Sequence, residues 1–138
     1  MFLDSLKPTL EQHTAWMCRE IQSDRSRFFI GALNSVDIGY VRFERGTVSK
    51  DITPAFASFP NLWNCSLAVE ASKRGQGLGS EMYRLAEMEF LYEEKTRPLT
   101  LLTWAHSDNY ASWRVFERAG WTRSYVKDFG EVVIRSIT

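Results

Sequence analysis

Residues 63–80 read WNCSLAVEASKRGQGLGS, an apolar run followed by a glycine-rich turn. Trp63–Val69 has the composition of a buried strand, and apolar residues then recur at helical spacing over Leu78–Lys95. Arg97-Pro98 ends that helix, and Leu99–Ala105 is a second strand-like run. A strand, a turn, a helix and a strand in this order predict a βαβ unit with two neighbouring parallel strands.

Antiparallel strands are expected on both sides of this unit. Phe28–Leu33 and Ile38–Glu44 are typical of a hairpin, because each run is rich in strand-forming residues and the segment between them is turn-like. Trp121–Lys127 and Glu131–Ile137 read as two closing strands. The polar segment Arg45–Asn61, which two prolines interrupt, is predicted to be a loop.

Two further helices are predicted outside the βαβ unit. Thr9–Gln12 fits a capping box, and apolar residues over Leu10–Ile21 recur at helical spacing. Asn109 can cap the other helix, which Gly120 would end in a left-handed conformation. Glu93–Lys95 reads as a solvated helix end. Four of the five tryptophans are expected in the core, since large aromatic side chains dominate burial; they are Trp63, Trp104, Trp113 and Trp121.

Composition limits the function classes. The chain has 138 residues, which suits one domain, and its 17 basic and 17 acidic residues cancel. A neutral chain gives no electrostatic reason to expect nucleic acid or an anionic membrane as a partner. No leader or membrane-spanning pattern is present, so a cytoplasmic location is expected. Cys18 and Cys65 form no C-x-x-C, and His13 and His106 are not spaced as ligands near them, so no metal is expected.

The glycine-rich turn would open a helix with free backbone N–H groups. Those groups, the helix dipole and the charge of Arg74 favour a phosphate or a pyrophosphate. A plain βα turn that uses glycine only for its geometry stays open. The turn contains no P-loop string, and Ser80 stands where the last glycine of a dinucleotide fingerprint should be. His106 follows the second strand in place of the ribose-binding acid, so NAD is disfavoured.

Two motifs in order carry a family resemblance. Arg74–Gly79 reads R-x-x-G-x-G, and residues 109–121 read NYASWRVFERAGW. Over roughly Phe28 to Trp121 the chain resembles the GNAT superfamily of acetyl-CoA-dependent N-acetyltransferases. The resemblance implies one acetyltransferase-like domain over residues 1–138. The implied fold is α+β (mixed α/β): a mixed, mostly antiparallel sheet flanked by helices, with one parallel βαβ pair that parts at the cofactor cleft.

The same resemblance implies where acetyl-CoA binds. Backbone groups of Leu67 and Val69 would hold the pantetheine arm, and the amides of Gln76–Ser80 would hold the pyrophosphate with help from Arg74. Asn109 would lie near the thioester end, and the remaining helix residues would line the cleft. The implied cofactor-binding residues are Leu67, Ala68, Val69, Arg74, Gly75, Gln76, Gly77, Leu78, Gly79, Ser80, Asn109, Ser112 and Phe116.

The catalytic groups depart from the family pattern. Phe116 stands where many relatives carry a tyrosine that protonates the leaving thiolate, but a thiol of pKa about 8.5 leaves fairly well without it. Tyr110 or Ser112 could donate instead, although Tyr110 also fits a packing or surface aromatic. His106 could serve as a base or water relay, and it also fits a polar loop. Relatives often carry a carboxylate where this chain offers Asn64 and Ser66. The catalytic candidates are therefore His106, Tyr110 and Ser66.

The acceptor is expected to be a primary amine of low pKa, because no strong base is evident. His13 and Trp16 in the first predicted helix look like the subgroup that acetylates amino sugars on nucleotide carriers, which favours a small molecule. A protein amino group and a non-catalytic acyl-CoA-binding module remain alternatives. The family usually begins with a strand and a helix, so Met1–Leu6 is either a stub of that strand or the strand is missing. In the second case a homodimer partner could complete the acceptor wall.

Overall fold

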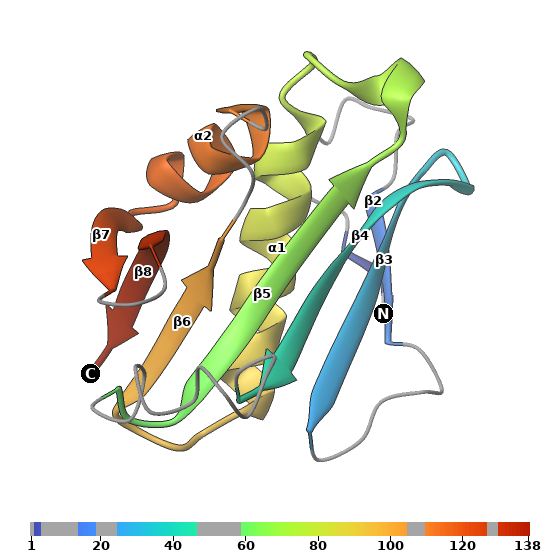
Figure 1. Cartoon of the computed structure of the whole chain (residues 1–138). Coiled ribbons are helices and arrows are strands. Elements are labelled where there is room, and N and C mark those ends of the chain that lie inside the picture. The colour runs from blue at the N-terminus through green and yellow to red at the C-terminus, as the bar shows by residue number, and fades with distance from the viewer. Residues whose placement is uncertain (1, 4–13, 19–24, 47–58, 105–109, 127–129) are drawn as a thin grey trace.

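The computed structural model describes residues 2–3, 14–18, 25–46, 59–104, 110–126 and 130–138 (Figure 1). Eight strands form one sheet in the order β1-β2-β3-β4-β5-β6-β8-β7. The elements are β1 (Phe2–Leu3), β2 (Thr14–Cys18), β3 (Ser26–Leu33), β4 (Val36–Arg45), β5 (Leu62–Val69), a 3-10 turn η2 (Ala71–Lys73), α1 (Leu78–Glu93), β6 (Leu99–Thr103), α2 (Tyr110–Arg118), β7 (Thr122–Val126) and β8 (Gly130–Ile137). No helix in this described part of the chain is long and apolar enough to cross a membrane.

The parallel pair that the sequence predicted is β5 with β6. Leu62 lies opposite Thr100 and Asn64 opposite Leu102, whereas all other neighbouring strands are antiparallel. The pairing of β5 with β6 ends at Asn64, but β5 continues to Val69 with β4 as its only neighbour among the described strands. The two parallel strands therefore part at their carboxyl ends, and the predicted mixed, mostly antiparallel fold is confirmed.

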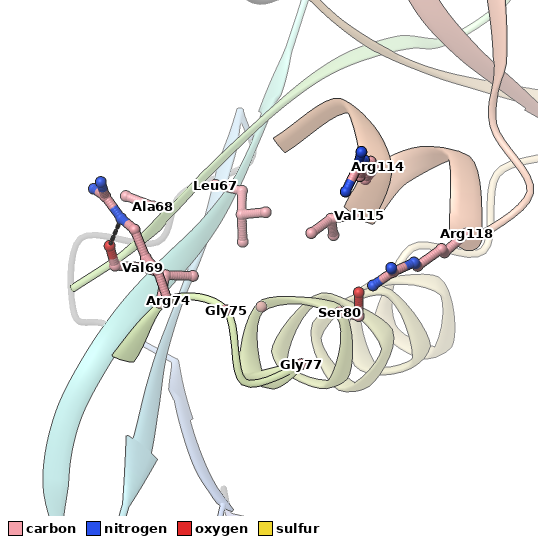
Figure 2. Close-up of a pocket in the computed structure, with 11 residues that line it drawn as sticks. Leu67, Ala68, Val69, Arg74, Gly75, Gly77, Ser80, Arg114, Val115 and Arg118 are labelled. Carbon is pink, nitrogen blue, oxygen red and sulfur yellow. Dashed lines mark hydrogen bonds between the residues drawn. The ribbon is translucent and has the colours of Figure 1, made fainter. Parts of the chain in front are cut away.

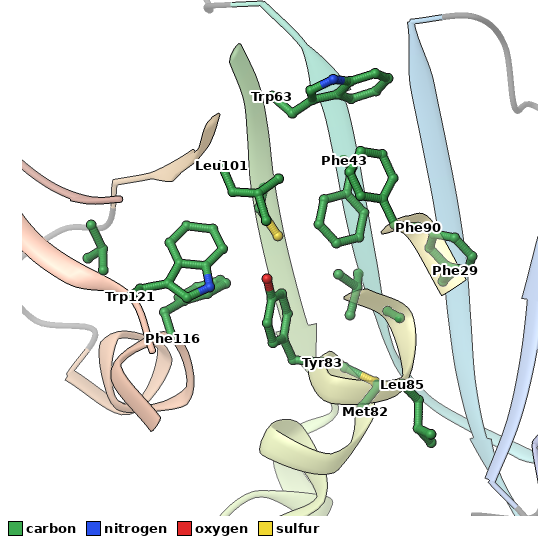
Figure 3. Close-up of a cluster of buried hydrophobic side chains, with 14 of the residues drawn as sticks. Phe29, Phe43, Trp63, Met82, Tyr83, Leu85, Phe90, Leu101, Phe116 and Trp121 are labelled. Carbon is green, nitrogen blue, oxygen red and sulfur yellow. The ribbon is translucent and has the colours of Figure 1, made fainter. Parts of the chain in front are cut away.

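Helix α1 lies across one face of the sheet and buries an aromatic core there (Figure 3). The rings of Phe43 and Phe90 stack 4.2 Å apart, and Trp63 meets Phe90 edge-on at 4.9 Å. Each fully buried aromatic ring contributes about 1.5–3 kcal/mol relative to an exposed one. Trp63, Trp113 and Trp121 are buried as predicted, and Trp104 is half-buried.

The remaining predicted elements are confirmed with small shifts at their ends. The hairpin is β3 with β4, the helix after the glycine-rich turn is α1, and the closing strands are β7 and β8. Helix α2 ends before Gly120, whose φ of +94° is the predicted left-handed conformation. The N–H of Trp121 donates to the carbonyl oxygen of Phe116 (N···O 3.0 Å), which closes the helix end. Most of the loop predicted at Arg45–Asn61 lies outside the described residues.

The helix predicted from Thr9 is wrong where the structure describes it. Thr14–Cys18 is strand β2, and Trp16 pairs with Gly31 of β3. The prediction rested on helical spacing over Leu10–Ile21, but in the described part of that segment the pairing with β3 satisfies the backbone of β2 and overrides the spacing. The H-x-x-W pair is consequently not on a helix at Trp16, while Thr9–His13 lies outside the described residues. Phe2–Leu3 forms the short strand β1 against β2, in agreement with an amino-terminal strand stub.

The prediction of a solvated end for α1 fails at Glu94, which is only 8% exposed. Its carboxylate accepts the N–H of Thr96 (N···O 3.2 Å) and lies 3.8 Å from the guanidinium of Arg45. Burial raises the pKa of Glu94, but the hydrogen bonds from Thr96 and the charges of Arg45 and Arg27 outweigh it and hold the pKa below its ordinary value.

Candidate functional site

A cavity of about 580 Å³ opens where β5 leaves β6, between the glycine-rich turn, the first turn of α1 and one face of α2 (Figure 2). Eight of the predicted cofactor-binding residues line it, together with three from α2 that were not predicted. The lining residues are Leu67, Ala68, Val69, Arg74, Gly75, Gly77, Gly79, Ser80, Arg114, Val115 and Arg118.

Successive residues of β5 direct their backbone N–H and C=O groups alternately toward β4 and toward β6. The observed hydrogen bonds show which residues face which neighbour. The carbonyl oxygen of Leu62 accepts the N–H of Gly46 (2.7 Å), and the N–H of Glu70 donates to the carbonyl oxygen of Ile38 (2.7 Å). Both contacts are on the β4 side. Because strand residues alternate with a period of two, the even-numbered residues of β5 direct their backbone groups toward β4.

The odd-numbered residues direct their backbone groups to the other side. The carbonyl oxygen of Asn61 accepts the N–H of Thr100 from β6 (3.2 Å). Leu67 and Val69 have the same parity but lie beyond the last pair that β5 forms with the described part of β6, and both residues line the cavity. The carbonyl oxygen of Val69 accepts Nε of Arg74 (3.0 Å). An unpaired strand edge of this kind can bind an extended ligand that carries amide groups.

The glycine-rich turn brings backbone amides to the cavity. Gly75 and Gly77 have φ of +77° and +76°, which only glycine adopts readily. Gly77 is the N-cap of α1 and makes no side-chain capping bond. The amides of the first helical residues, Leu78–Ser80, have no acceptor within the helix, and the N–H of Glu81 is the first to find one, at Gly77 (3.2 Å). Such a turn attracts an anion.

Gly79 allows the start of α1 to lie close to both walls. A Cβ atom at Gly79 would be 3.2 Å from Cγ2 of Val69 and 3.5 Å from Cγ2 of Val115. The first contact is tighter than ordinary side chains make, so a larger residue would push β5 away from the helix. The close approach also places α2 directly beside the amide turn.

Three arginines give the cavity a positive charge. Arg74 lies on the β5 side, while Arg114 and Arg118 lie on the α2 side (Figure 2). All three side chains are exposed, and none forms an ion pair with a residue in the described ranges. The nearby carboxylate of Glu70 accepts hydrogen bonds from Ser72, which occupies it. The cavity therefore combines free amides with cationic side chains, which suits an anionic ligand.

The two arginines of α2 were missed by the sequence reasoning. Arg114 and Arg118 are four residues apart, so they share one face of the helix. That spacing was available in the sequence, but charged residues on a helix are also typical of a solvated surface. The direction of this face depends on tertiary packing, with Val115 beside Gly79 and Phe116 on Tyr83 and Trp121.

Some predicted cofactor-binding residues have side chains elsewhere. Among the described residues that line the cavity, Phe116 is absent: it is 2% exposed and packs on Tyr83 (5.1 Å) and Trp121 (4.6 Å). Two residues along a helix correspond to about 200°, so Phe116 faces away from the arginine face. The side chain of Leu78 packs on the core, and Nε2 of Gln76 donates to the carbonyl oxygen of Ser72 (3.4 Å). Their backbone amides remain part of the turn.

The catalytic candidates are only partly placed. Ser66 is half-buried on β5, opposite Arg42 of β4. It has the opposite parity to Trp63 and Cys65, so it lies on the sheet face away from the α1 core. Tyr110 is the first residue of α2, and its side chain and that of Ser112 lie outside the described structure. His106 and Asn109 also lie outside the described residues.

A buried polar network fixes α2 relative to α1. Glu87 accepts the hydroxyl of Tyr83 (2.9 Å) and Nη1 of Arg135 (2.7 and 2.6 Å to its two oxygens). The same Nη1 donates to the carbonyl oxygen of Ala119, just after α2 (3.0 Å). Burial raises the pKa of Glu87 and outweighs the opposing effects of Arg135 and Tyr83. Burial also raises the pKa values of Tyr83 and Cys65, so both stay protonated.

Comparison with known proteins agrees with this geometry. The family model "Acetyltransferase (GNAT) family" matches residues 2–121. Among solved structures, the aminoglycoside acetyltransferase AAC(6')-Ib in complex with coenzyme A is 24% identical, with a TM-score of 0.64 over 82% of this chain and 67% of that one.

Two other solved structures show the same fold at lower identity. RimL, a ribosomal L7/L12 alpha-N-protein acetyltransferase in complex with coenzyme A, is 15% identical (TM-score 0.56; 82% of this chain, 63% of that one). The Campylobacter jejuni N-acetyltransferase PseH is 14% identical (TM-score 0.57; 85% and 72%). No curated protein matches. The match over residues 2–121, with the parted parallel strands and the amide turn, shows that the chain belongs to the acetyltransferase (GNAT) family, a family of acyltransferases.

Proposed function

We propose that this chain binds acetyl-CoA in the cavity of Figure 2 and transfers the acetyl group to a primary amine of low pKa, an amino sugar or another small molecule. The observation that carries the proposal is that the cavity-side edge of β5 and the amide turn follow each other directly along the cavity. The β5 edge at Leu67 and Val69, which no described strand pairs with on the cavity side, runs directly into the amide turn at the start of α1. This order matches a ligand that has amide groups along one arm and a diphosphate at its end.

The residues that line the cavity fit such a ligand. Backbone groups of Leu67 and Val69 would pair with the amides of the pantetheine arm, as an added strand would. The amides of Leu78–Ser80 and the guanidinium of Arg74 would hold the diphosphate. Gly77 leaves that approach free, because no side chain projects from the N-cap.

For the acetyl transfer, the protein needs mainly to orient the thioester beside the amine and to polarise the thioester carbonyl group. When bound, acetyl-CoA supplies a thioester that an amine can attack. The β5 edge would orient it, and a backbone N–H on this edge would polarise the carbonyl group. Phe116 has no proton to give, so we assign the acid role to Tyr110 or Ser112 at the start of α2. A thiol of pKa about 8.5 makes this assistance modest near neutral pH.

The base role is assigned to His106, or to a water molecule that His106 or Ser66 holds. Neither is a strong base, so the acceptor should be an amine that is already partly neutral near pH 7–8. The relatives named above support this range of acceptors, since one acts on aminoglycosides and another on a protein amino terminus. Acetylation of a protein amino group therefore remains the second candidate.

The proposal extends to the setting of the enzyme. All described strands share one sheet, which supports a single domain over residues 1–138. We assign it to the cytoplasm, where a free buried thiol such as Cys65 is usual. Because β1 supplies the amino-terminal strand stub, the missing strand that would call for a homodimer partner is not part of the proposal.

Calorimetric titration with acetyl-CoA, followed by thiol release with a panel of amines, tests the proposal. Saturable binding is expected, and a ligand at 100 times its Kd should stabilise the fold by about 2.7 kcal/mol. Thiol release should be fastest with amines of low pKa. Activity only above about pH 9 with a lysine-like amine would refute the acceptor class, and absence of binding would refute the whole proposal.

A further inference from the structure

The guanidinium groups of Arg114 and Arg118 are an unusual pair for a helix surface. Both line the same cavity from α2, one helical turn apart. Like charges at this spacing weaken a helix slightly. The nearby carboxylate of Glu117 accepts a hydrogen bond from Nη2 of Arg123 instead (3.1 Å). No carboxylate in the described part of the chain is paired with either arginine.

The pair lies beside the amide turn. The Cβ position of Gly79 is 3.5 Å from Cγ2 of Val115, the neighbour of Arg114 in α2. Figure 2 shows the Arg118 side chain extending toward Ser80 at the start of α1, while Arg74 stands on the opposite side of the turn. The amides are thus flanked by positive charge from two elements that are far apart in the sequence.

The number of phosphate groups in coenzyme A suggests a ligand for these two arginines. Coenzyme A carries a diphosphate and, on the adjoining ribose, a separate 3′-phosphate. The amides of Leu78–Ser80 and Arg74 suffice for the diphosphate. The 3′-phosphate is joined to it through one ribose ring, so it must bind close to the same turn. A guanidinium group is well suited to a phosphate monoester, because its N–H groups can bind two oxygens at once.

We propose that Arg114 and Arg118 bind the 3′-phosphate of coenzyme A and make the cavity selective for coenzyme A over dephospho-coenzyme A. This inference rests on the proposed function, because it presumes that the coenzyme occupies the cavity. The position of Arg118 in the last turn of α2 also suits the helix dipole. The dipole gives no reason for Arg114, which stands one turn earlier on the same face.

Calorimetric titration of coenzyme A and dephospho-coenzyme A into the wild type, Arg114→Ala, Arg118→Ala and the double variant tests the inference. The wild type should prefer coenzyme A by about tenfold or more, the usual effect of a charged hydrogen bond. Each variant should lose affinity for coenzyme A only. The double variant should bind both ligands about as well as the wild type binds dephospho-coenzyme A.

Lys95→Ala is the matched control. It removes one exposed positive charge at the other end of α1, a helix of 16 residues and about 24 Å. Its preference for coenzyme A should equal that of the wild type. Both arginines are exposed, so their variants should fold; Arg114→Gln and Arg118→Gln retain more of the side chain, and melting curves check the fold.

Two results would overturn the inference while leaving the proposed function intact. The wild type could bind both ligands equally, or the arginine variants could weaken both by the same factor, which would place the arginines on the diphosphate. If neither ligand binds the wild type, the proposed function itself fails.

Discussion

The two walls of the cavity present similar chemistry but are built differently. One wall is continuous in sequence, from Leu67 through the glycine-rich turn to Ser80, and offers mainly backbone groups. Their positions depend on the left-handed conformation of Gly75 and Gly77. The other wall is one face of α2, and it offers the side chains of Arg114 and Arg118.

The difference concerns what holds each wall in place. The first depends on local backbone geometry, so one substitution within the turn should destroy it. The second depends on the buried network in which Arg135 connects Glu87 of α1 with the carbonyl oxygen of Ala119 after α2. We therefore expect changes in the first wall to affect binding more than stability, whereas changes in the network that holds the second wall should affect stability more than binding.

The largest effect on binding is expected from Gly77→Leu. The leucine must adopt a left-handed φ of +76°, and its side chain would occupy the approach to the amides. Loss of hydrogen bonds from two amides to a charged phosphate corresponds to about 3 kcal/mol, or roughly a hundredfold in the Kd of acetyl-CoA. Calorimetric titration measures it.

Gly130→Leu is the matched control for this change. Gly130 also has a positive φ, +121°, and a Cβ there would meet nothing within 4 Å, as at Gly77. Both variants should lose stability, by about 1–2 kcal/mol, through backbone strain alone. Only Gly77→Leu should lose binding; equal affinities in the two variants would contradict the assignment of the turn.

The largest effect on stability is expected from Glu87→Ala. The change leaves the Tyr83 hydroxyl without its acceptor and Arg135 without its carboxylate, which should lower the free energy of unfolding by about 3 kcal/mol. Urea denaturation measures the loss. Glu117→Ala, which removes an exposed ion pair with Arg123, should cost less than about 1 kcal/mol. Similar losses in both variants would show that the network does not fix α2.

The same contrast explains how far the sequence could predict the fold. The βαβ unit was predictable because β5, the turn and α1 each carry a local signal, and a parallel pair follows from their order. Residues 14–18 were misassigned because the helical spacing over Leu10–Ile21 is a local signal, whereas the strand conformation of residues 14–18 depends on pairing with β3. Glu94 was misassigned because its burial depends on the distant Arg45.

The candidate site divides in the same way. Eight predicted residues of the β5 edge and the glycine-rich turn line the cavity, because they belong to one contiguous motif, and their role in binding a cofactor stays a prediction. Arg114 and Arg118 were missed and Phe116 was placed in the cleft, because the rotation of α2 about its axis is set by core packing on Tyr83 and Trp121. A helical wheel alone does not say which face meets a neighbour.

A smaller effect is expected where the two walls meet, at Gly79→Ala. The added Cβ would lie 3.2 Å from Cγ2 of Val69, and this crowding should outweigh the better helix propensity of alanine, for a net loss of about 1 kcal/mol. In a Val69→Ala background the loss should largely disappear. A double-mutant cycle by urea denaturation measures the coupling, and additive effects would show that β5 can move away freely.

The smallest effects are expected in the dependence of stability on pH, where two buried glutamates should act in opposite directions. The pKa of Glu94 lies below its ordinary value of about 4.3, so its stabilising effect is present above that value and is lost as the pH falls through the folded pKa. The pKa of Glu87 is raised, so stability falls as the pH rises from about 4.3 through the folded pKa. We would measure the urea midpoints of the wild type, Glu94→Gln and Glu87→Gln on both sides of about pH 4.3. The difference between wild type and variant should rise with pH for Glu94→Gln and fall with pH for Glu87→Gln. If the two slopes have the same sign, one of the two buried environments is not as described.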